Sequence, residues 1–109
     1  VELICAGTDG EVTREDVLFA GAIVSRLTSS PLETNDSGRL ALDAWKKIGG
    51  DQLSPVELTE ELRASKGGQN LIQIGMDADI RLAAEIDAAT IVPRLKISTW
   101  EISAESELA

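Results

Sequence analysis

The chain begins with an apolar run, Val1 to Ala6, which leads into a loop of small residues, Gly7 to Gly10. A short continuous apolar run before glycines is typical of a strand that is buried on both faces. Thr13 follows as a good helix N-cap, and Glu15 and Asp16 fall in the first helical turn, where acids favour the helix dipole. The pattern therefore predicts a strand, a loop and a helix start in direct succession.

Apolar positions then repeat at helical spacing and predict four or five helices. The first helix starts after Thr13, is expected to be largely buried, and stops before Pro31. The second starts near Asn35 or Asp36 and stops at Gly49-Gly50. Its inward-facing residues are predicted to be Leu40, Ala41, Ala44, Trp45 and Ile48.

The middle of the chain also contains residues that are typical of helix starts and ends. The segment Ser54-Pro55-Val56-Glu57 is a capping box with proline at the first helical position, and predicts a helix to about Ser65. Lys66-Gly67-Gly68 is interpreted as a break. The stretch from Asn70 to Gly75 fits a helix or a strand, with the helix favoured, and Asp77 is expected to cap a further short helix.

Apolar and polar residues alternate near the C-terminus, which predicts strands. Thr90 to Val92 is expected to be a strand that Pro93 closes. Leu95 to Ile102 alternates as well, with a change of phase that a bulge near Ser98 or Thr99 would explain. Because an unpaired apolar strand invites aggregation, we expect this strand to pair with material other than the first strand, from a partner chain or from an N-terminal half outside this sequence.

The composition of the chain excludes several classes of function but says less about its fold. One domain or less fits into 109 residues, and we expect it to occupy residues 1–104, with a frayed acidic tail at 105–109. The net charge of −9 argues against nucleic-acid partners and anionic membrane surfaces. The single cysteine excludes an internal disulfide and is typical of the cytoplasm. The absence of histidine removes the commonest general base and metal ligand.

The predicted strands are too few to build a complete sheet. A buried strand needs neighbours on both sides, and the sequence starts inside a strand pattern without an initiator methionine. We therefore expect an N-terminal half outside this sequence, or a second chain in a homo-oligomer, to complete the sheet.

The loop from Ala6 to Gly10 is the best place for a ligand, since strand ends and helix starts bind ligands in α/β folds. Gly7 and Gly10 would let the backbone approach a phosphate, and the Thr8 hydroxyl would donate a hydrogen bond to it. The alternative is a tight turn that simply needs glycine.

The charged residues near this loop also have two interpretations. Glu15 and Asp16 are adjacent and point about 100° apart on a helix, so they cannot aim at one point without a bridging ion. As plain first-turn acids, each is worth about 0.3–1 kcal/mol. Arg39 either pairs with Asp36 one turn away or binds an anionic substrate group. Cys5 is expected to be a small buried hydrophobe rather than a nucleophile.

A longer motif adds to these residue-level arguments. The segment CAGTDGEVTREDVLFAGAIV resembles the motif of the 2-phosphosulfolactate phosphatase family. The matching residues are Cys5, Ala6, Gly7, Thr8, Gly10, Thr13, Glu15, Asp16, Ala20 and Gly21. Weaker similarity continues through Asn35–Leu42, Gly67–Leu71, Gly75–Asp79 and Val92-Pro93, so that the resemblance covers nearly the whole chain.

The resemblance implies Mg²⁺-dependent hydrolysis of 2-phospho-3-sulfolactate to 3-sulfolactate and phosphate, a step of coenzyme M biosynthesis. It also implies an α/β fold, a mixed-sheet αβα sandwich, of which this chain would be roughly the C-terminal half. Gly7, Thr8 and Gly10 would then bind the phosphate, and Arg39 would bind substrate. Glu15 or Asp16 would hold the metal or position the water.

Two other functions stay open on the sequence alone. One is a related phosphatase that acts on another small phosphoester, because a fold does not determine its substrate. The other is a non-catalytic half-domain that completes a sheet or supplies an interface.

Overall fold

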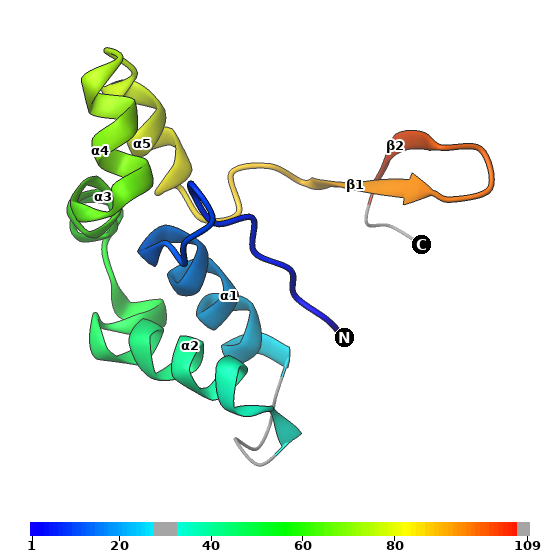
Figure 1. Ribbon diagram of the computed structural model, residues 1–109, viewed down its shortest axis with the longest axis horizontal. Helices are drawn as coiled ribbons and strands as arrows, with labels where there is room; N and C mark the ends of the chain where they lie inside the picture. The colour runs from blue at the N-terminus through cyan, green and yellow to red at the C-terminus, as the bar shows by residue number, and fades with distance from the viewer. Residues whose placement is uncertain (28–32, 107–109) are drawn as a thin grey trace.

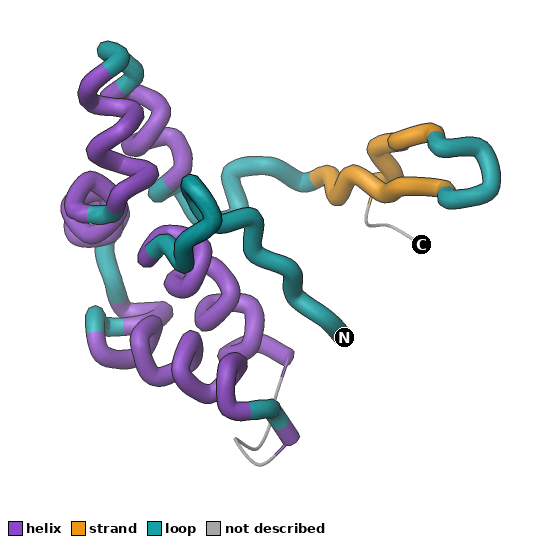
Figure 2. The backbone as a smooth tube through the Cα atoms, viewed as in Figure 1, coloured by secondary structure: helices purple, strands orange, loops and turns teal. Residues whose placement is uncertain are grey.

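The computed structural model describes residues 1–27 and 33–106 of the chain. Helices gather into one body, and a β-hairpin projects away from them (Figure 1). The elements in chain order are α1 (Arg14–Leu27), α2 (Asp36–Lys47), the 3₁₀-helix η2 (Gly50–Gln52), α3 (Pro55–Ala64), α4 (Lys66–Gln73), α5 (Asp77–Ala83), β1 (Ile91–Lys96) and β2 (Glu101–Ser106). Figure 2 separates these helices and strands from the loops between them. The architecture is therefore mixed, with helices and a small sheet.

Helices α1 and α2 form a closely packed antiparallel pair. Gly21 makes this approach possible, because a Cβ atom at its position would collide with the carbonyl oxygen of Ala41. Trp45, one turn further along α2, is 2% exposed and packs with Leu18 of α1. The predicted inward face of α2 is wrong at Leu40, which is 69% exposed. Nor is α1 largely buried: Leu18, Gly21 and Val24 are its fully buried residues, and most of the others are half-buried.

The core joins the α1–α2 pair to the group formed by α3, α4 and α5. Its buried members come from three helices and the residue that ends α5: Leu18, Trp45, Leu58 and Ala84. Ala22, Ala44, Ile48, Leu53 and Leu62 pack around them. Burying each aliphatic side chain stabilises the fold by about 1.5–3 kcal/mol. The predicted inward position of Trp45 is confirmed.

Local capping signals determine where α2 and α3 begin. Asn35 caps α2 by accepting a hydrogen bond from the Gly38 N–H at 2.9 Å. At α3 the capping box is complete, since Ser54 accepts from the Glu57 N–H at 3.2 Å and Glu57 accepts from the Ser54 N–H at 2.8 Å. Both starts are confirmed as the sequence predicted them.

The predicted break at Lys66-Gly67-Gly68 is wrong, because α4 starts there. Ser65 makes this possible. Its hydroxyl donates to the Leu62 carbonyl at 2.6 Å and accepts from the Gly68 N–H at 3.0 Å, so one buried side chain ends α3 and caps α4. The glycines are needed for packing: a Cβ atom on Gly68 would collide with the Leu62 carbonyl oxygen.

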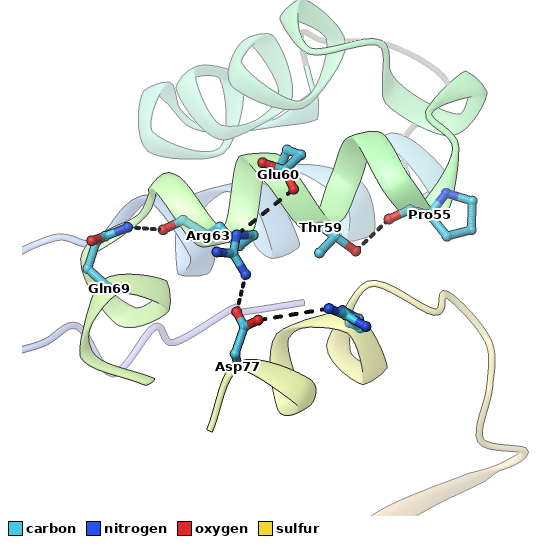
Figure 3. Close-up of polar contacts among 7 residues, drawn as sticks. Pro55, Thr59, Glu60, Arg63, Gln69 and Asp77 are labelled. Carbon is cyan, nitrogen blue, oxygen red and sulfur yellow. Dashed lines mark hydrogen bonds and ion pairs between the residues drawn. The ribbon is translucent and has the colours of Figure 1, made fainter. Parts of the chain in front are cut away.

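Polar contacts tie α3 to the next two helices (Figure 3). Arg63 of α3 forms an ion pair with Asp77 of α5, and its backbone carbonyl accepts from Gln69 Nε2 of α4 at 2.7 Å. Asp77 was expected to cap α5, but it is the first residue of this helix. Met76 occupies the N-cap position and makes no capping hydrogen bond with its side chain. The side chains of this ion pair are partly exposed, so it contributes only about 0–1 kcal/mol.

The C-terminal strands differ from the prediction in both boundaries and pairing. Ile91 lies opposite Ser106 and Lys96 opposite Glu101, so β1 and β2 pair with each other as an antiparallel hairpin. The change of phase near Ser98 is a turn rather than a bulge, and the predicted single strand from Leu95 to Ile102 is wrong. Pro93 lies inside β1 instead of closing it, which an edge strand tolerates.

The ends of the predicted segments also need correction. Val1 to Ala6 is extended but is not a strand, because no described segment pairs with it. At the other end β2 runs to Ser106, whereas residues 107–109 of the expected tail lie outside the described residues. The predicted end of the first helix, at Ser29-Ser30-Pro31, also lies outside them. Across residues 1–27 and 33–106, none of the helices has the length and apolar character needed to cross a bilayer.

We predict that Gly21→Ala destabilises the chain, although alanine is the better helix former. The collision with the Ala41 carbonyl forces α1 and α2 apart, which should cost about 1–3 kcal/mol. Urea unfolding followed by circular dichroism measures this cost. The control is Asp43→Ala, an exposed site on α2 where alanine should be neutral or slightly stabilising. A Gly21→Ala variant at least as stable as wild type would contradict the packing argument.

Candidate functional site

The loop before α1 is a tight turn closed by its own backbone. The Thr8 N–H donates to the Glu11 carbonyl, and the Glu11 N–H donates to the Thr8 carbonyl, each at 3.0 Å. Gly7, Asp9 and Gly10 all have positive φ, between 54° and 76°. A Cβ atom on Gly7 would also lie 2.5 Å from the Glu11 carbonyl oxygen. Both glycines are therefore explained by the turn, whether or not the loop binds a ligand.

Asp16 attaches this loop to the first turn of α1. Its Oδ2 accepts hydrogen bonds from the Gly7 N–H at 2.8 Å and from the Thr13 hydroxyl at 3.4 Å. The Cys5 thiol donates a hydrogen bond to the Asp16 backbone carbonyl, with 3.7 Å between the sulfur and the oxygen. Helix α1 starts directly after Thr13, as expected, and Thr13 is buried. Cys5 is exposed rather than buried, because the segment that carries it lacks a covering neighbour among the described residues.

Glu15 points in a different direction, toward the start of α4. Its Oε1 faces Gly67 so closely that a Cβ atom there would lie 2.5 Å away. Burial of this carboxylate acts to raise its pKa. The N–H groups of Glu15 itself and of Gly67, with the hydroxyls of Thr13 and Ser65 nearby, outweigh that effect and hold the pKa of Glu15 below its ordinary value. Glu15 therefore links α1 to the N-terminus of α4.

The second oxygen of Glu15 is different. Oε2 is buried and has no hydrogen-bond partner within the part of the chain that the structure describes. A buried carboxylate oxygen without a partner is costly, so a donor or a cation at this position would stabilise it. The two adjacent acids thus serve different partners, as their angular separation on the helix predicted.

The start of α4 joins the site, which the sequence analysis missed. Lys66 Nζ lies 3.5 Å from Asp9 Oδ2 of the loop, and Gly67 lies against Glu15. The N-termini of α1 and α4, both ends with positive partial charge, are brought together with a lysine beside them. The available signal was Ser65, three residues before Gly68, which is the spacing of a helix cap. The glycine pair that follows suggested a break instead.

Arg39 is not brought to the loop. It is exposed on α2, two residues before Ala41, and Ala41 lies against Gly21 in the second half of α1. Arg39 also forms no ion pair with Asp36, its expected alternative partner, within the part of the chain that the structure describes. Gly7, Thr8, Gly10, Glu15 and Asp16 thus form one cluster, and Arg39 lies apart from it.

Two further observations limit what the cluster can hold. Among the described residues, no group of three or more Cys, Asp and Glu side chains is placed to bind a metal ion together. A magnesium ion here would rely on at most two of these side chains, with substrate and water as its other ligands. A mainly apolar pocket of about 250 Å³ lies next to Glu15, between α1, α3 and the residues after α5. Its lining does not include the loop, so it does not suit a phosphate.

The sequence model of the family described as 2-phosphosulpholactate phosphatase matches residues 1–98, which include the loop, both helix starts and β1. The chain belongs to the 2-phosphosulfolactate phosphatase family.

Curated relatives carry the same family name. A protein named "Probable 2-phosphosulfolactate phosphatase" from Symbiobacterium thermophilum is 35% identical over 95 residues, which is 85% of this chain and 38% of the relative. Relatives with the same name from Deinococcus radiodurans and Thermotoga maritima are 33% and 37% identical, over 87% and 85% of this chain and 37% of each relative. The chain therefore spans less than two fifths of the length of each of these three relatives. No solved structure matches the chain.

We predict that Glu15→Gln lowers the stability of this family member more at neutral pH than in acid. Since the folded-state pKa of Glu15 lies below its ordinary value of 4.5, the ionised form stabilises the fold above that pH. This contribution is lost as the pH falls through the lowered pKa. Urea unfolding in EDTA at about pH 7 and about pH 3.5 measures the difference between wild type and variant.

Glu85→Gln, at an exposed position after α5, is the matched control for removing a carboxylate. It should leave stability nearly unchanged at both pH values. The same difference between wild type and Glu15→Gln in acid as at neutral pH would show that the charge of Glu15 does not stabilise the junction.

Proposed function

We propose that the chain is part of a Mg²⁺-dependent phosphatase that hydrolyses 2-phospho-3-sulfolactate to 3-sulfolactate and phosphate, as in coenzyme M biosynthesis. The family match over residues 1–98 is the observation that carries this proposal. Since the relatives are much longer, the activity would belong to this chain together with the remaining part of the family's sequence. The single cysteine supports a cytoplasmic enzyme.

The complete fold would be the mixed-sheet αβα sandwich. The extended Val1–Cys5 segment would be one of its strands, and α1 would be the helix that follows that strand. This order places the loop from Gly7 to Gly10 at the carboxyl end of the strand, where α/β folds bind their ligands.

In the reaction, water attacks phosphorus, the P–O bond to the sulfolactate oxygen breaks, and that oxygen takes a proton. Negative charge spreads over the equatorial oxygens of the phosphoryl group and must be stabilised. This chain supplies two helix N-termini and Lys66 beside the loop, which together favour an anion despite the net charge of −9. The Thr8 hydroxyl would donate to a phosphate oxygen.

Glu15 and Asp16 would have different roles in the reaction. Bound Mg²⁺ would neutralise charge on the phosphoryl oxygens. Glu15 is the carboxylate that fits such an ion, because Oε2 has no partner among the described residues. Asp16 would act as a positioning residue, since it holds the loop through the Gly7 N–H. Gly10 allows the turn, and Arg39 would bind the sulfonate only if the complete fold brings it nearer.

The place of Arg39 also favours a second candidate function. With Arg39 apart from the loop, Lys66 is the cation that the described residues place beside it. A small phosphoester with a single anionic group would suit that arrangement. The relevant activity would then be a related phosphatase with another substrate.

We predict that residues 1–109 alone hydrolyse the substrate slowly, because the apolar segment before the loop has no paired neighbour within the described residues. Phosphate release from 2-phospho-3-sulfolactate, measured with and without Mg²⁺, tests this. Robust Mg²⁺-dependent turnover by the chain alone would show that the loop and α1 need no further sheet.

A chimera tests the function itself. Residues 1–98 replace the matching segment of the Symbiobacterium thermophilum relative, and phosphate release is measured on 2-phospho-3-sulfolactate and on a panel of small phosphoesters. Activity on the sulfonated substrate supports the proposal, and activity only on others supports the second candidate. A folded but inactive chimera would support the non-catalytic half-domain.

In the active chimera we predict that Glu15→Ala and Asp16→Ala each lower turnover by about 10²-fold, or about 2.7 kcal/mol. Asp16→Asn should recover much of the activity, since asparagine can still accept from the Gly7 N–H. Glu15→Gln should not recover it, and should raise the Mg²⁺ concentration needed for half-maximal rate. Asp43→Ala is the control, and melting of the same samples separates catalysis from stability. Wild-type turnover in both alanine variants would leave these acids as structural residues.

A further inference from the structure

We propose that the pocket between α1, α3 and the residues after α5 binds a small organic ammonium compound with an apolar body. The charged nitrogen would lie at the Glu15 carboxylate, and the apolar body would lie against Leu18 and Trp45. Binding would need neither a phosphoester nor turnover. The proposal therefore goes beyond the proposed phosphatase and does not rest on it.

The size of the pocket suits a ligand with a single ring. The pocket lies along one side of α1 and has a volume of about 250 Å³. Leu18, Trp45 and Leu58, all buried, contribute to its lining, and so does exposed Phe19 at the protein surface. A cavity of about 150 Å³ with aliphatic and aromatic walls is enough to hold benzene. The pocket therefore has room for one ring and a short chain.

The charged groups of the lining favour a cation. They are three carboxylates, Glu15, Glu85 and Asp87, and one guanidinium, Arg26, whose Nη1 lies 3.4 Å from Asp87 Oδ1. Within residues 1–27 and 33–106, neither Glu15 nor Glu85 forms an ion pair. A cleft lined mainly by one sign of charge attracts ligands of the opposite sign. This lining would therefore attract an ammonium group and repel carboxylates, sulfonates and phosphates.

Glu15 supplies the specific contact. Its side chain forms part of the pocket wall, and its Oε2 is buried without a hydrogen-bond partner among the described residues. An unsatisfied carboxylate oxygen is costly, and a charged N–H group is the strongest donor it can meet. Rotation of the carboxylate about its terminal torsion, which has a broad profile, would bring this oxygen to a ligand in the pocket. An ammonium nitrogen would then satisfy it.

The same oxygen is the one that fits Mg²⁺ in the proposed phosphatase. Two cations cannot occupy one carboxylate oxygen together, so the ammonium compound would oppose the metal ion and inhibit the complete enzyme. This consequence depends on the proposed function. The binding itself does not, and it is measured in EDTA without substrate.

Three probes of similar shape separate the effect of charge from that of size. They are 2-phenylethylammonium, the neutral 2-phenylethanol and the anionic 3-phenylpropionate. Each is titrated into residues 1–109, and into the chimera that carries residues 1–98, with binding followed by methyl and amide chemical shifts in NMR spectra. We expect the ammonium compound to bind roughly tenfold more tightly than the alcohol, and the anion to bind most weakly. The largest shifts should come from Leu18, Ala22 and Leu58.

Two variants connect the preference for a cation to Glu15. Glu15→Gln keeps the shape of the side chain and removes its charge, so the ammonium compound should lose its tenfold advantage. The alcohol should bind to this variant as before, which shows that the pocket is still formed. Asp43→Asn, at an exposed carboxylate on α2 outside the pocket, is the matched control and should leave both affinities unchanged.

Four results would overturn the proposal. They are the absence of saturable shifts with every probe, equal affinities for the ammonium compound and the alcohol, and a preference for the ammonium compound that persists in Glu15→Gln. The fourth is binding to residues 1–109 but not to the chimera, which would show that the remaining sequence of the family covers the pocket. An inactive chimera that binds the ammonium compound would instead count against the phosphatase alone.

Discussion

The first turn of α1 holds the candidate site together, because two adjacent carboxylates bind in two directions. Asp16 accepts from the Gly7 N–H and so attaches the loop, and Glu15 meets the start of α4 at Gly67. Neither partner lies on α1 itself. The loop, the N-terminus of α1 and the N-terminus of α4 are therefore placed relative to each other through a single helical turn, and a change at either acid alters more than a local charge.

This arrangement also matters for the proposed phosphate site, because the chain as a whole is acidic. Asp16 is engaged with the Gly7 N–H and the Thr13 hydroxyl, and Asp9 is paired with Lys66. The N-terminal ends of α1 and α4, which carry positive partial charge, lie beside the loop. Net charge describes the surface as a whole, whereas binding depends on which groups are already paired. Oε2 of Glu15, buried without a partner, is the exception, and it is the atom that a cation or a donor would satisfy.

Sequence reasoning succeeded where the signal was local. The caps at Asn35 and Ser54 and the start of α1 after Thr13 depend on residues three or four positions apart. It failed where a distant residue decides the structure. Gly67 and Gly68 suggest a break when read alone, but they are the residues that allow Glu15 and the Leu62 carbonyl to approach. The cluster of loop residues and first-turn acids was predictable from their proximity in sequence, and the contribution of α4 was not.

The errors at the two ends of the chain have a different physical origin. The helices bury a core of their own around Leu18 and Trp45, so their positions agree with the apolar pattern. The strand-like segments do not reach that core. Val1–Cys5 stays unpaired among the described residues, and the hairpin pairs only with itself. A helix satisfies its backbone hydrogen bonds internally, whereas a strand depends on neighbours, so the apolar pattern alone predicts the helices of this chain better than its strands.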